Sequence, residues 1–206
     1  MENKIYSNKD KDLVLVRRLK RGDYKAFDLL LLKYQSRVVG LALKFVKDLQ
    51  IAEDIAQESF LKAYKSINSF REESAFYTWI YRITVNTSKN YLTSKSRKKE
   101  LSESDIKRLE DSEDIFDIPG GSSPEEILSA NNLREVIMES LTNLPEDIRT
   151  AISLREFEGL TYEEISEVLN CPIGTVRSRI FRGREIMQER ISPILNEDKK
   201  LNKSSK

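Results

Sequence analysis

The sequence has 206 residues, of which 39% are hydrophobic and 33% are charged, and its formal net charge is +1. A chain of this length and modest apolar content suits two small domains better than one large core. It has no histidine and a single cysteine, Cys171, which excludes an intrachain disulfide, a cysteine zinc site and the commonest general base. No segment alternates apolar and polar residues for long, so we expect an all-α fold without strands.

The first predicted domain spans residues 10–94 and begins with three helices. Apolar residues at helical spacing predict a short helix that ends at Gly22, a long helix from about 27 to 45, and a third helix from about 51 to 67. The third helix also has a polar face, formed by Asp54, Gln57 and Glu58. By spacing alone, this face indicates only exposure to solvent.

A fourth helix is predicted from 74 to 92, and its composition points to nucleic acid. Between Ser74 and Lys99 there are six basic residues and no acidic one. The face opposite the apolar stripe carries Arg82, Asn86 and Lys89. Aromatic residues lie in or just before the helix: Phe70, Phe76, Tyr77, Trp79, Tyr81 and Tyr91. Cations neutralise phosphates and aromatic rings stack on unpaired bases, so the pattern is typical of a single-strand site.

The alternative is that most of these rings belong to the hydrophobic core. We expect this for Phe76 and in part for Trp79, but not for all, because one helix of a small domain is not expected to bury every face.

Residues 95–127 are predicted to form a flexible acidic linker. From Glu100 to Glu126, ten acidic residues face two basic ones, and the segment contains the sequence Pro119-Gly-Gly-Ser-Ser-Pro124. A solvated tether has this composition. The alternative is that the segment mimics nucleic acid or shields the basic surfaces.

The second predicted domain spans residues 128–192 and contains a helix-turn-helix pattern. A break is expected at Leu144-Pro145. Residues 170–172 form a turn of the length that a helix-turn-helix requires, and the last helix is expected to begin near Gly174 or Thr175.

That last helix has an apolar face and a basic face. The apolar face consists of Val176, Ile180, Gly183 and Met187. The opposite face consists of Arg177, Ser178, Phe181, Arg182 and Glu185. Arginine can bond guanine in the major groove of DNA, apolar atoms can meet the methyl group of thymine, and Thr175 near the helix start is placed to meet a phosphate. The alternative is a solvated arginine-rich helix.

These segments resemble the extracytoplasmic-function sigma factors of the sigma-70 family, and most closely the sigma-E type of envelope stress. The motifs that carry the resemblance in the first domain are Asp54-Ile-Ala-Gln-Glu58-Ser-Phe60, Ser69-Phe-Arg71, Ser74-Ala-Phe-Tyr-Thr-Trp79, Tyr81-Arg-Ile and Val85-Asn86. Those in the second are Leu144-Pro145-Glu-Asp-Ile-Arg149, Leu154-Arg155-Glu156, Gly159-Leu-Thr-Tyr-Glu-Glu-Ile165 and Gly174-Thr-Val-Arg-Ser-Arg-Ile-Phe-Arg182. The likeness covers nearly all of residues 10–192 and is weakest in the linker and the tail after 196.

The resemblance implies a sigma region 2 domain at 10–94, a sigma region 4 domain at 128–192, and the role of a promoter-directing subunit without catalytic residues, metal or cofactor. Residues that match the core-polymerase-binding motif are Asp54, Gln57 and Glu58. Residues that match the reader of the −10 element are Phe70, Trp79, Arg82, Asn86 and Lys89. Residues that match the reader of the −35 element are Thr175, Arg177, Ser178, Phe181 and Arg182.

The implied partners are core RNA polymerase, promoter DNA that is duplex at −35 and single-stranded at −10, and a membrane-anchored anti-sigma factor. The implied targets are envelope or extracytoplasmic stress genes. The polar N-terminal segment and the lack of an apolar run of about 18 residues predict a cytoplasmic chain without membrane insertion.

Two other functions stay open on the residues alone. They are a helix-turn-helix repressor acting without polymerase, and an Mg²⁺-dependent nucleic-acid enzyme using the linker carboxylates.

Overall fold

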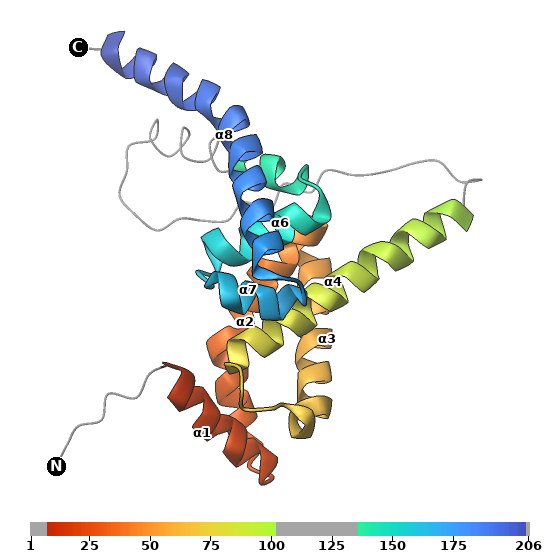
Figure 1. Cartoon of the computed structure of the whole chain (residues 1–206). Coiled ribbons are helices and arrows are strands. Elements are labelled where there is room, and N and C mark those ends of the chain that lie inside the picture. The colour runs from red at the N-terminus through yellow and green to blue at the C-terminus, as the bar shows by residue number, and fades with distance from the viewer. Residues whose placement is uncertain (1–7, 102–135, 205–206) are drawn as a thin grey trace, which may run out of the picture. The chain divides into compact units, whose positions relative to one another are not determined.

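The structure, a computed structural model, describes the backbone of residues 8–101 and 136–204 and the side chains within 11–95 and 136–192. Every regular element in these ranges is helical (Figure 1), which confirms the all-α prediction. The chain divides into two compact units, residues 1–110 with 163–170 and residues 111–162 with 171–206. Within the described ranges, no helix combines the length and apolarity that a bilayer crossing requires.

The described N-terminal part of the first unit, residues 8–101, contains four long helices and a short 3-10 turn. These are α1 (Asn8–Lys20), α2 (Lys25–Val46), α3 (Leu49–Ser66), the 3-10 turn (Ile67–Ser69) and α4 (Phe76–Leu101). Gly22 ends α1 as predicted, with a φ of +91° that L-residues rarely adopt. Asp48 caps α3, since its carboxylate accepts a hydrogen bond of 3.0 Å from the Ile51 N–H.

Helix α4 packs against α1, α2 and α3. It is longer than predicted and continues from Leu92 to Leu101. The segment 93–101 contains no Gly or Pro, and its basic residues are favourable near the negative end of the helix dipole. The first residues of the predicted linker are therefore helical, and the linker from 102 onward lies outside the described residues.

A buried polar group joins α1 to α2. Asp12 is fully buried, and Lys33 Nζ lies 2.5 Å from its Oδ1. The Tyr34 hydroxyl donates a hydrogen bond to the other carboxylate oxygen. Burial and this carboxylate raise the pKa of Tyr34. The carboxylate is thus paired on both oxygens, which a buried charge requires.

The second unit is built on α6 (Glu146–Ile152), which continues as a π-helical turn (Ser153–Phe157), and on α8 (Ile173–Ser204). Residues 136–142 form a helix before α6, so the predicted break at Leu144-Pro145 is confirmed. In the chain, helix α7 (Tyr162–Leu169) comes between these elements and groups with the first unit from residue 163 on; the turn after it contains Asn170, which has a φ of +49°. Helix α8 begins one residue before the predicted start.

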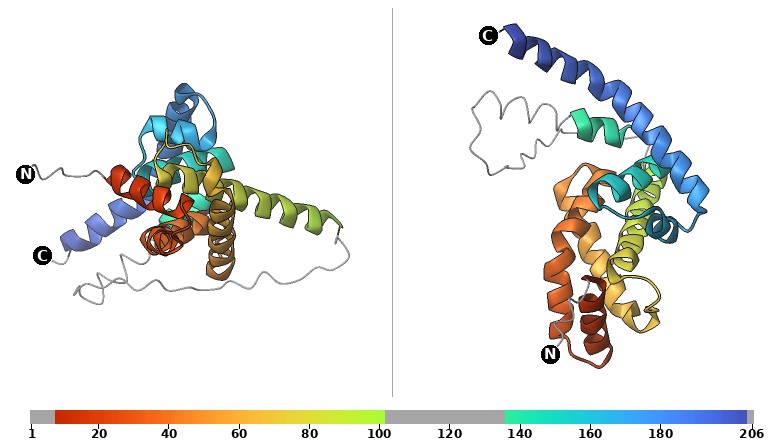
Figure 2. Two further views of the ribbon diagram at one scale, coloured as in Figure 1. Left: turned by 90° about the horizontal axis from the view of Figure 1, so that it is seen from below. Right: turned by 60° about the vertical axis from the view of Figure 1, so that its left-hand side comes forward.

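Helices α6 and α8 pack against each other (Figure 2). A Cβ atom on Gly183 would lie 2.4 Å from Ile152 Cγ1 and 2.9 Å from Ile148 Cγ2. Only hydrogen fits there, so the glycine sets the separation between the two helices.

We expect Gly183→Ala to destabilise the second unit by about 1–3 kcal/mol, because the added methyl overpacks this contact. Gly174→Ala is the matched control: a Cβ there meets nothing within 4 Å, and alanine is the better helix former. Urea unfolding followed by circular dichroism measures both. An unchanged midpoint for Gly183→Ala would contradict the packing argument.

Candidate nucleic-acid interface

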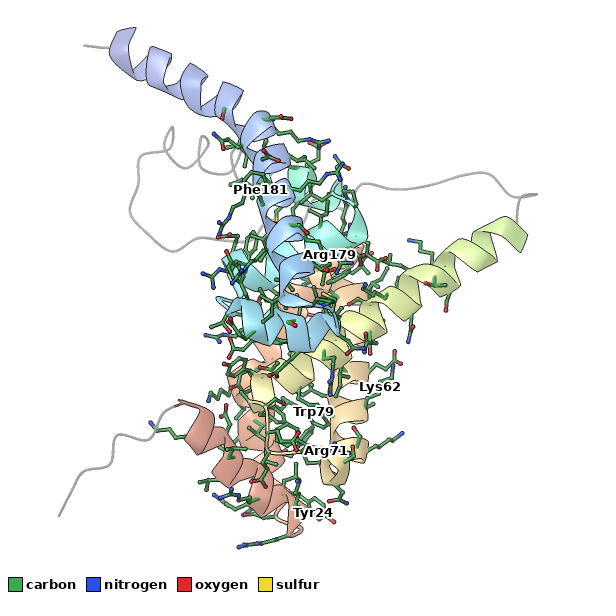
Figure 3. The ribbon with its side chains drawn as sticks, viewed as in Figure 1. Tyr24, Lys62, Arg71, Trp79, Arg179 and Phe181 are labelled. Atoms are coloured by element: carbon green, nitrogen blue, oxygen red, sulfur yellow. The ribbon has the colours of Figure 1, made fainter. Side chains whose placement is uncertain are left out.

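Helix α8 presents one buried and one exposed face, as its sequence predicts. Val176 and Ile180 are 0% and 1% exposed, and Gly183 is buried. On the other side the Phe181 side chain is 65% exposed (Figure 3). A large ring in water is unfavourable unless something covers it.

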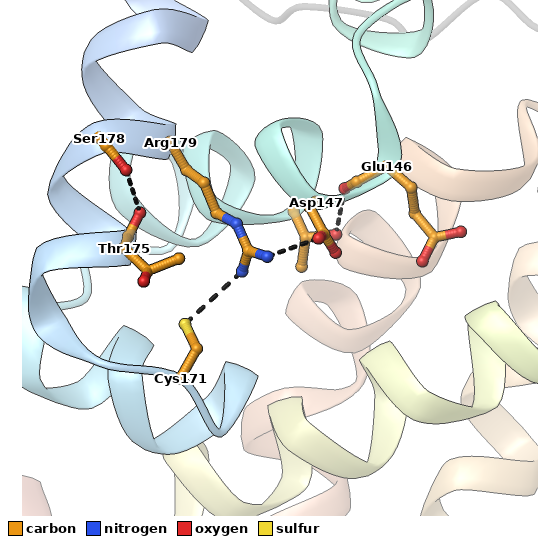
Figure 4. Close-up of polar contacts among 7 residues, drawn as sticks. Glu146, Asp147, Cys171, Thr175, Ser178 and Arg179 are labelled. Atoms are coloured by element: carbon orange, nitrogen blue, oxygen red, sulfur yellow. Dashed lines mark hydrogen bonds and ion pairs between the residues drawn. The ribbon is translucent and has the colours of Figure 1, made fainter.

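Two of the four arginines in the first part of α8 are held by carboxylates of the second unit. Arg179 Nη2 lies 2.5 Å from Asp147 Oδ2, and its Nη1 lies 3.5 Å from the Cys171 sulfur (Figure 4). Arg184 donates two hydrogen bonds of 2.9 and 2.7 Å to Glu156 Oε1. This contact raises the pKa of the Arg184 guanidinium.

The other two arginines, Arg177 and Arg182, are exposed and pair with no carboxylate among the described residues. Between them Ser178 is exposed, and its hydroxyl donates 2.9 Å to the Thr175 carbonyl (Figure 4). Thr175 is half-buried. The exposed face therefore combines two available guanidinium groups, a hydroxyl and the Phe181 ring, which are groups that read base edges in a major groove.

In the first unit, Arg82 and Asn86 are exposed one turn apart on α4, and Lys89 is half-buried. A cation and an amide at this spacing can meet the backbone and base edge of one strand.

The aromatic residues near α4 are more buried than the sequence led us to expect. Phe70 is 3%, Trp79 7% and Tyr81 0% exposed. The centroids of the Phe70 and Trp79 rings are 5.0 Å apart, and each ring also contacts Phe76. More rings are buried than expected because α4 packs against α1, α2 and α3 together, whereas Tyr77 and Tyr91 are only half-buried, as expected for some of the rings.

The polar residues Asp54, Gln57 and Glu58 are all exposed on α3. Glu58 pairs with Lys62 at 2.7 Å, and Lys62 Nζ donates 3.1 Å to the Thr87 hydroxyl of α4 (Figure 3 labels Lys62). These three side chains can contact a partner, and Lys62, which pairs with Glu58, also links this part of α3 to α4.

Two family models match the chain, "Sigma-70 region 2" over residues 30–98 and "Sigma-70, region 4" over residues 134–187. The chain is 47% identical over 191 residues to the RNA polymerase sigma-H factor of Pseudomonas aeruginosa, covering 91% of this chain and 97% of that one. It is also 47% identical over 187 residues to the ECF RNA polymerase sigma-E factor of Haemophilus influenzae, covering 89% and 97%.

The chain belongs to the extracytoplasmic-function sigma factors. As such it serves promoter-specific initiation of transcription in stress responses.

Solved structures agree with this assignment. The sigma factor RpoE of Bartonella quintana, solved with the anti-sigma factor NepR, has a TM-score of 0.68 at 26% identity and covers 82% of this sigma factor and 98% of its own chain. CnrH, solved with the cytosolic domain of CnrY, shares the fold with a TM-score of 0.63 at 20% identity, over 92% and 99% of the two chains.

Sequence reasoning missed the structural role of some cations in this sigma factor. Arg179 and Arg184 stand in the same basic run as Arg177 and Arg182, and residue type alone does not distinguish the two pairs. Their acidic partners are 32 and 28 residues away in the sequence. A helical wheel places both nearer the apolar stripe, and this is the one sequence signal that could have identified them.

We expect Arg179→Ala to lower the unfolding free energy of this sigma factor by about 1 kcal/mol, since it removes a half-exposed ion pair and the packing of its stem. Arg182→Ala removes the same charge without a partner and should leave stability unchanged. Urea midpoints compare the two variants. Equal losses of stability in the two variants would mean that Arg179 contributes no more to the fold than Arg182 does.

Proposed function

We propose that this sigma factor binds core RNA polymerase and directs it to promoters of envelope or extracytoplasmic stress genes, without catalysis of its own. Residues 128–192 would read the duplex −35 element and residues 10–94 the opened −10 element, with 95–127 as the connector. The observation that carries the proposal is the outward face of α8, where Arg177, Phe181 and Arg182 lie opposite the buried stripe.

The proposed −35 reader consists of Thr175, Arg177, Ser178, Phe181 and Arg182. Because the guanidinium groups of Arg177 and Arg182 have no carboxylate partner, no ion pair has to break before they bind guanine. Bound DNA would also cover the exposed Phe181 ring. Support comes from the pairing of the two neighbouring arginines with Asp147 and Glu156.

For the −10 reader, we propose that Arg82, Asn86 and Lys89 meet the opened strand. Phe70 and Trp79 would form the wall of a pocket for a flipped base. Since both rings are buried, a base would reach them only when the segment 70–75 moves. Unstacking a base costs a few kcal/mol, which the contacts in such a pocket would offset.

Asp54, Gln57 and Glu58 are the proposed contact with core polymerase. Three exposed polar side chains on one helix face suit a charged, helical partner surface.

We further propose that an anti-sigma factor, anchored in the membrane, holds this sigma factor inactive in the cytoplasm. The support is the likeness to RpoE of B. quintana, which was solved with an anti-sigma factor. An inhibitor that covers Phe181 would remove the same exposed apolar surface that DNA removes.

Run-off transcription with purified core polymerase tests the proposal. We expect promoter-specific transcripts only when this sigma factor is added. Tight binding to an operator without polymerase, and no transcript, would instead support a repressor.

We predict that Arg182→Ala weakens discrimination at one −35 position by about 1–3 kcal/mol, the value of one bidentate base contact. Competition binding of holoenzyme to promoters with single −35 substitutions measures this. Arg190→Ala, an exposed arginine further along α8, is the matched control and should leave discrimination intact. If Arg182→Ala weakens binding equally to every sequence, the side chain contacts only phosphate.

For Asn86→Ala we expect defective promoter opening with duplex binding nearly kept, because the amide meets bases only after strand separation. Permanganate reactivity of thymines around −10 reports opening, and gel shift reports binding. Asn143→Ala removes an exposed amide of the second unit and should change neither. Normal opening by Asn86→Ala would refute this role.

A further inference from the structure

An exposed aromatic pair lies at the end of the first unit where α1 joins α2 and α3 ends, and none of the proposed contacts uses it. The side chains of Tyr24 and Tyr64 are 65% and 38% exposed, and their ring centroids lie 6.2 Å apart at an interplanar angle of 45°. Phe27 holds the Tyr64 ring at 5.1 Å, and Phe27 in turn contacts Phe60 at 6.3 Å. Tyr64 is thus anchored to the core, and Tyr24 is the outer ring.

Basic residues flank both tyrosines in the sequence, and two of the four acids in the same segments are held in ion pairs. Glu72 pairs with Arg17 at 2.6 Å, which lowers the pKa of that carboxyl, and Asp23 pairs with Arg18 at 2.7 Å. In the segments 20–28 and 64–73, four exposed basic residues and two exposed acidic residues form no ion pair with a described residue: Arg21, Lys25, Lys65 and Arg71, and Asp28 and Glu73. The free charge at this end of the unit is therefore positive.

Lys20, at the end of α1 shortly before Tyr24, contacts Phe70 of the surface proposed for the opened strand. Its Nζ donates 2.8 Å to the Phe70 carbonyl and lies 5.7 Å from the centroid of the Phe70 ring. Arg17 binds Glu72 of the same loop. The end of α1 and the loop before α4 therefore form one continuous surface, and Figure 3 shows Tyr24 and Arg71 at the same end of the unit.

We propose that Tyr24 and Tyr64 form a second stacking site for unpaired bases of the opened promoter strand, beyond the bases met by Arg82 and Asn86. This inference rests on the proposed role of the first unit. An open ring face is of no use to paired bases, whose faces are already stacked, and it suits an unpaired base. The unpaired cations suit a phosphate backbone, and this charge favours a nucleic acid over an apolar peptide as the occupant of the site.

The test uses holoenzyme and a fork-junction promoter with 2-aminopurine placed at successive unpaired positions. Stacking on a tyrosine quenches 2-aminopurine fluorescence. We expect one position to be quenched by the wild type and by Tyr24→Phe, which keeps the ring, but not by Tyr24→Leu, which keeps only apolar bulk. Loss of one stacked base should shorten the lifetime of the open complex about five-fold or more.

Leu32→Ala is the matched control, since Leu32 lies on α2 with the same 65% exposure and is not aromatic. If Tyr24→Leu and Leu32→Ala give the same quenching profile and the same lifetime while wild type supports run-off, the stacking site is overturned and the first proposal stands. If wild type itself gives no run-off transcript, the proposed function fails first. Quenching that is lost in Tyr24→Leu but kept in Asn86→Ala would establish a site distinct from the α4 contacts.

Discussion

The close approach of α6 to α8 at Gly183 determines which residues of the second unit face solvent. Because the glycine has no side chain, Ile148 and Ile152 of α6 reach the surface of α8 directly. The helical period then turns the stripe that contains Ile180 inward and the side chain of Phe181 outward. The exposed ring is thus a consequence of packing on the opposite face, and it cannot turn inward unless the two helices separate.

The same packing divides the cations of α8. Asp147 lies in the first turn of α6 and Glu156 in the π-helical turn that follows, so both reach only arginines on the flanks of the contact. Arg177 and Arg182 lie beyond that reach. If Arg177 and Arg182 read DNA as proposed, a carboxylate beside either one would have to be displaced before DNA could bind. Acids at the flanks stabilise the unit without such competition.

The amphipathic pattern was sufficient to predict the elements and the buried stripe of α8, because both follow from a local repeat. Contacts between distant segments were not predictable: the ion pair between Arg179 and Asp147 spans 32 residues of sequence. The burial of Trp79 also depends on the Phe70 ring of the loop before α4 and on the helices that pack against α4, which no local repeat predicts. Local signals likewise misplaced the end of α4. The helix continues past the predicted end at Leu92 to Leu101, because no Gly or Pro follows Leu92 within it.

The aromatic residues in the two proposed DNA surfaces differ in what they can offer, and this follows from how each is held. Phe181 projects from the side of α8 near its N-terminal end. A major groove would present base edges and methyl groups to it, so only a small apolar contact is available. Tyr24 and Tyr64 lie at helix ends, with ring faces partly open, and an unpaired base can cover a whole face. Stacking of that kind exists only after the strands separate. The free energy of the proposed stacking would therefore favour the opened promoter over the closed one, whereas the proposed contacts of α8 would favour both states equally.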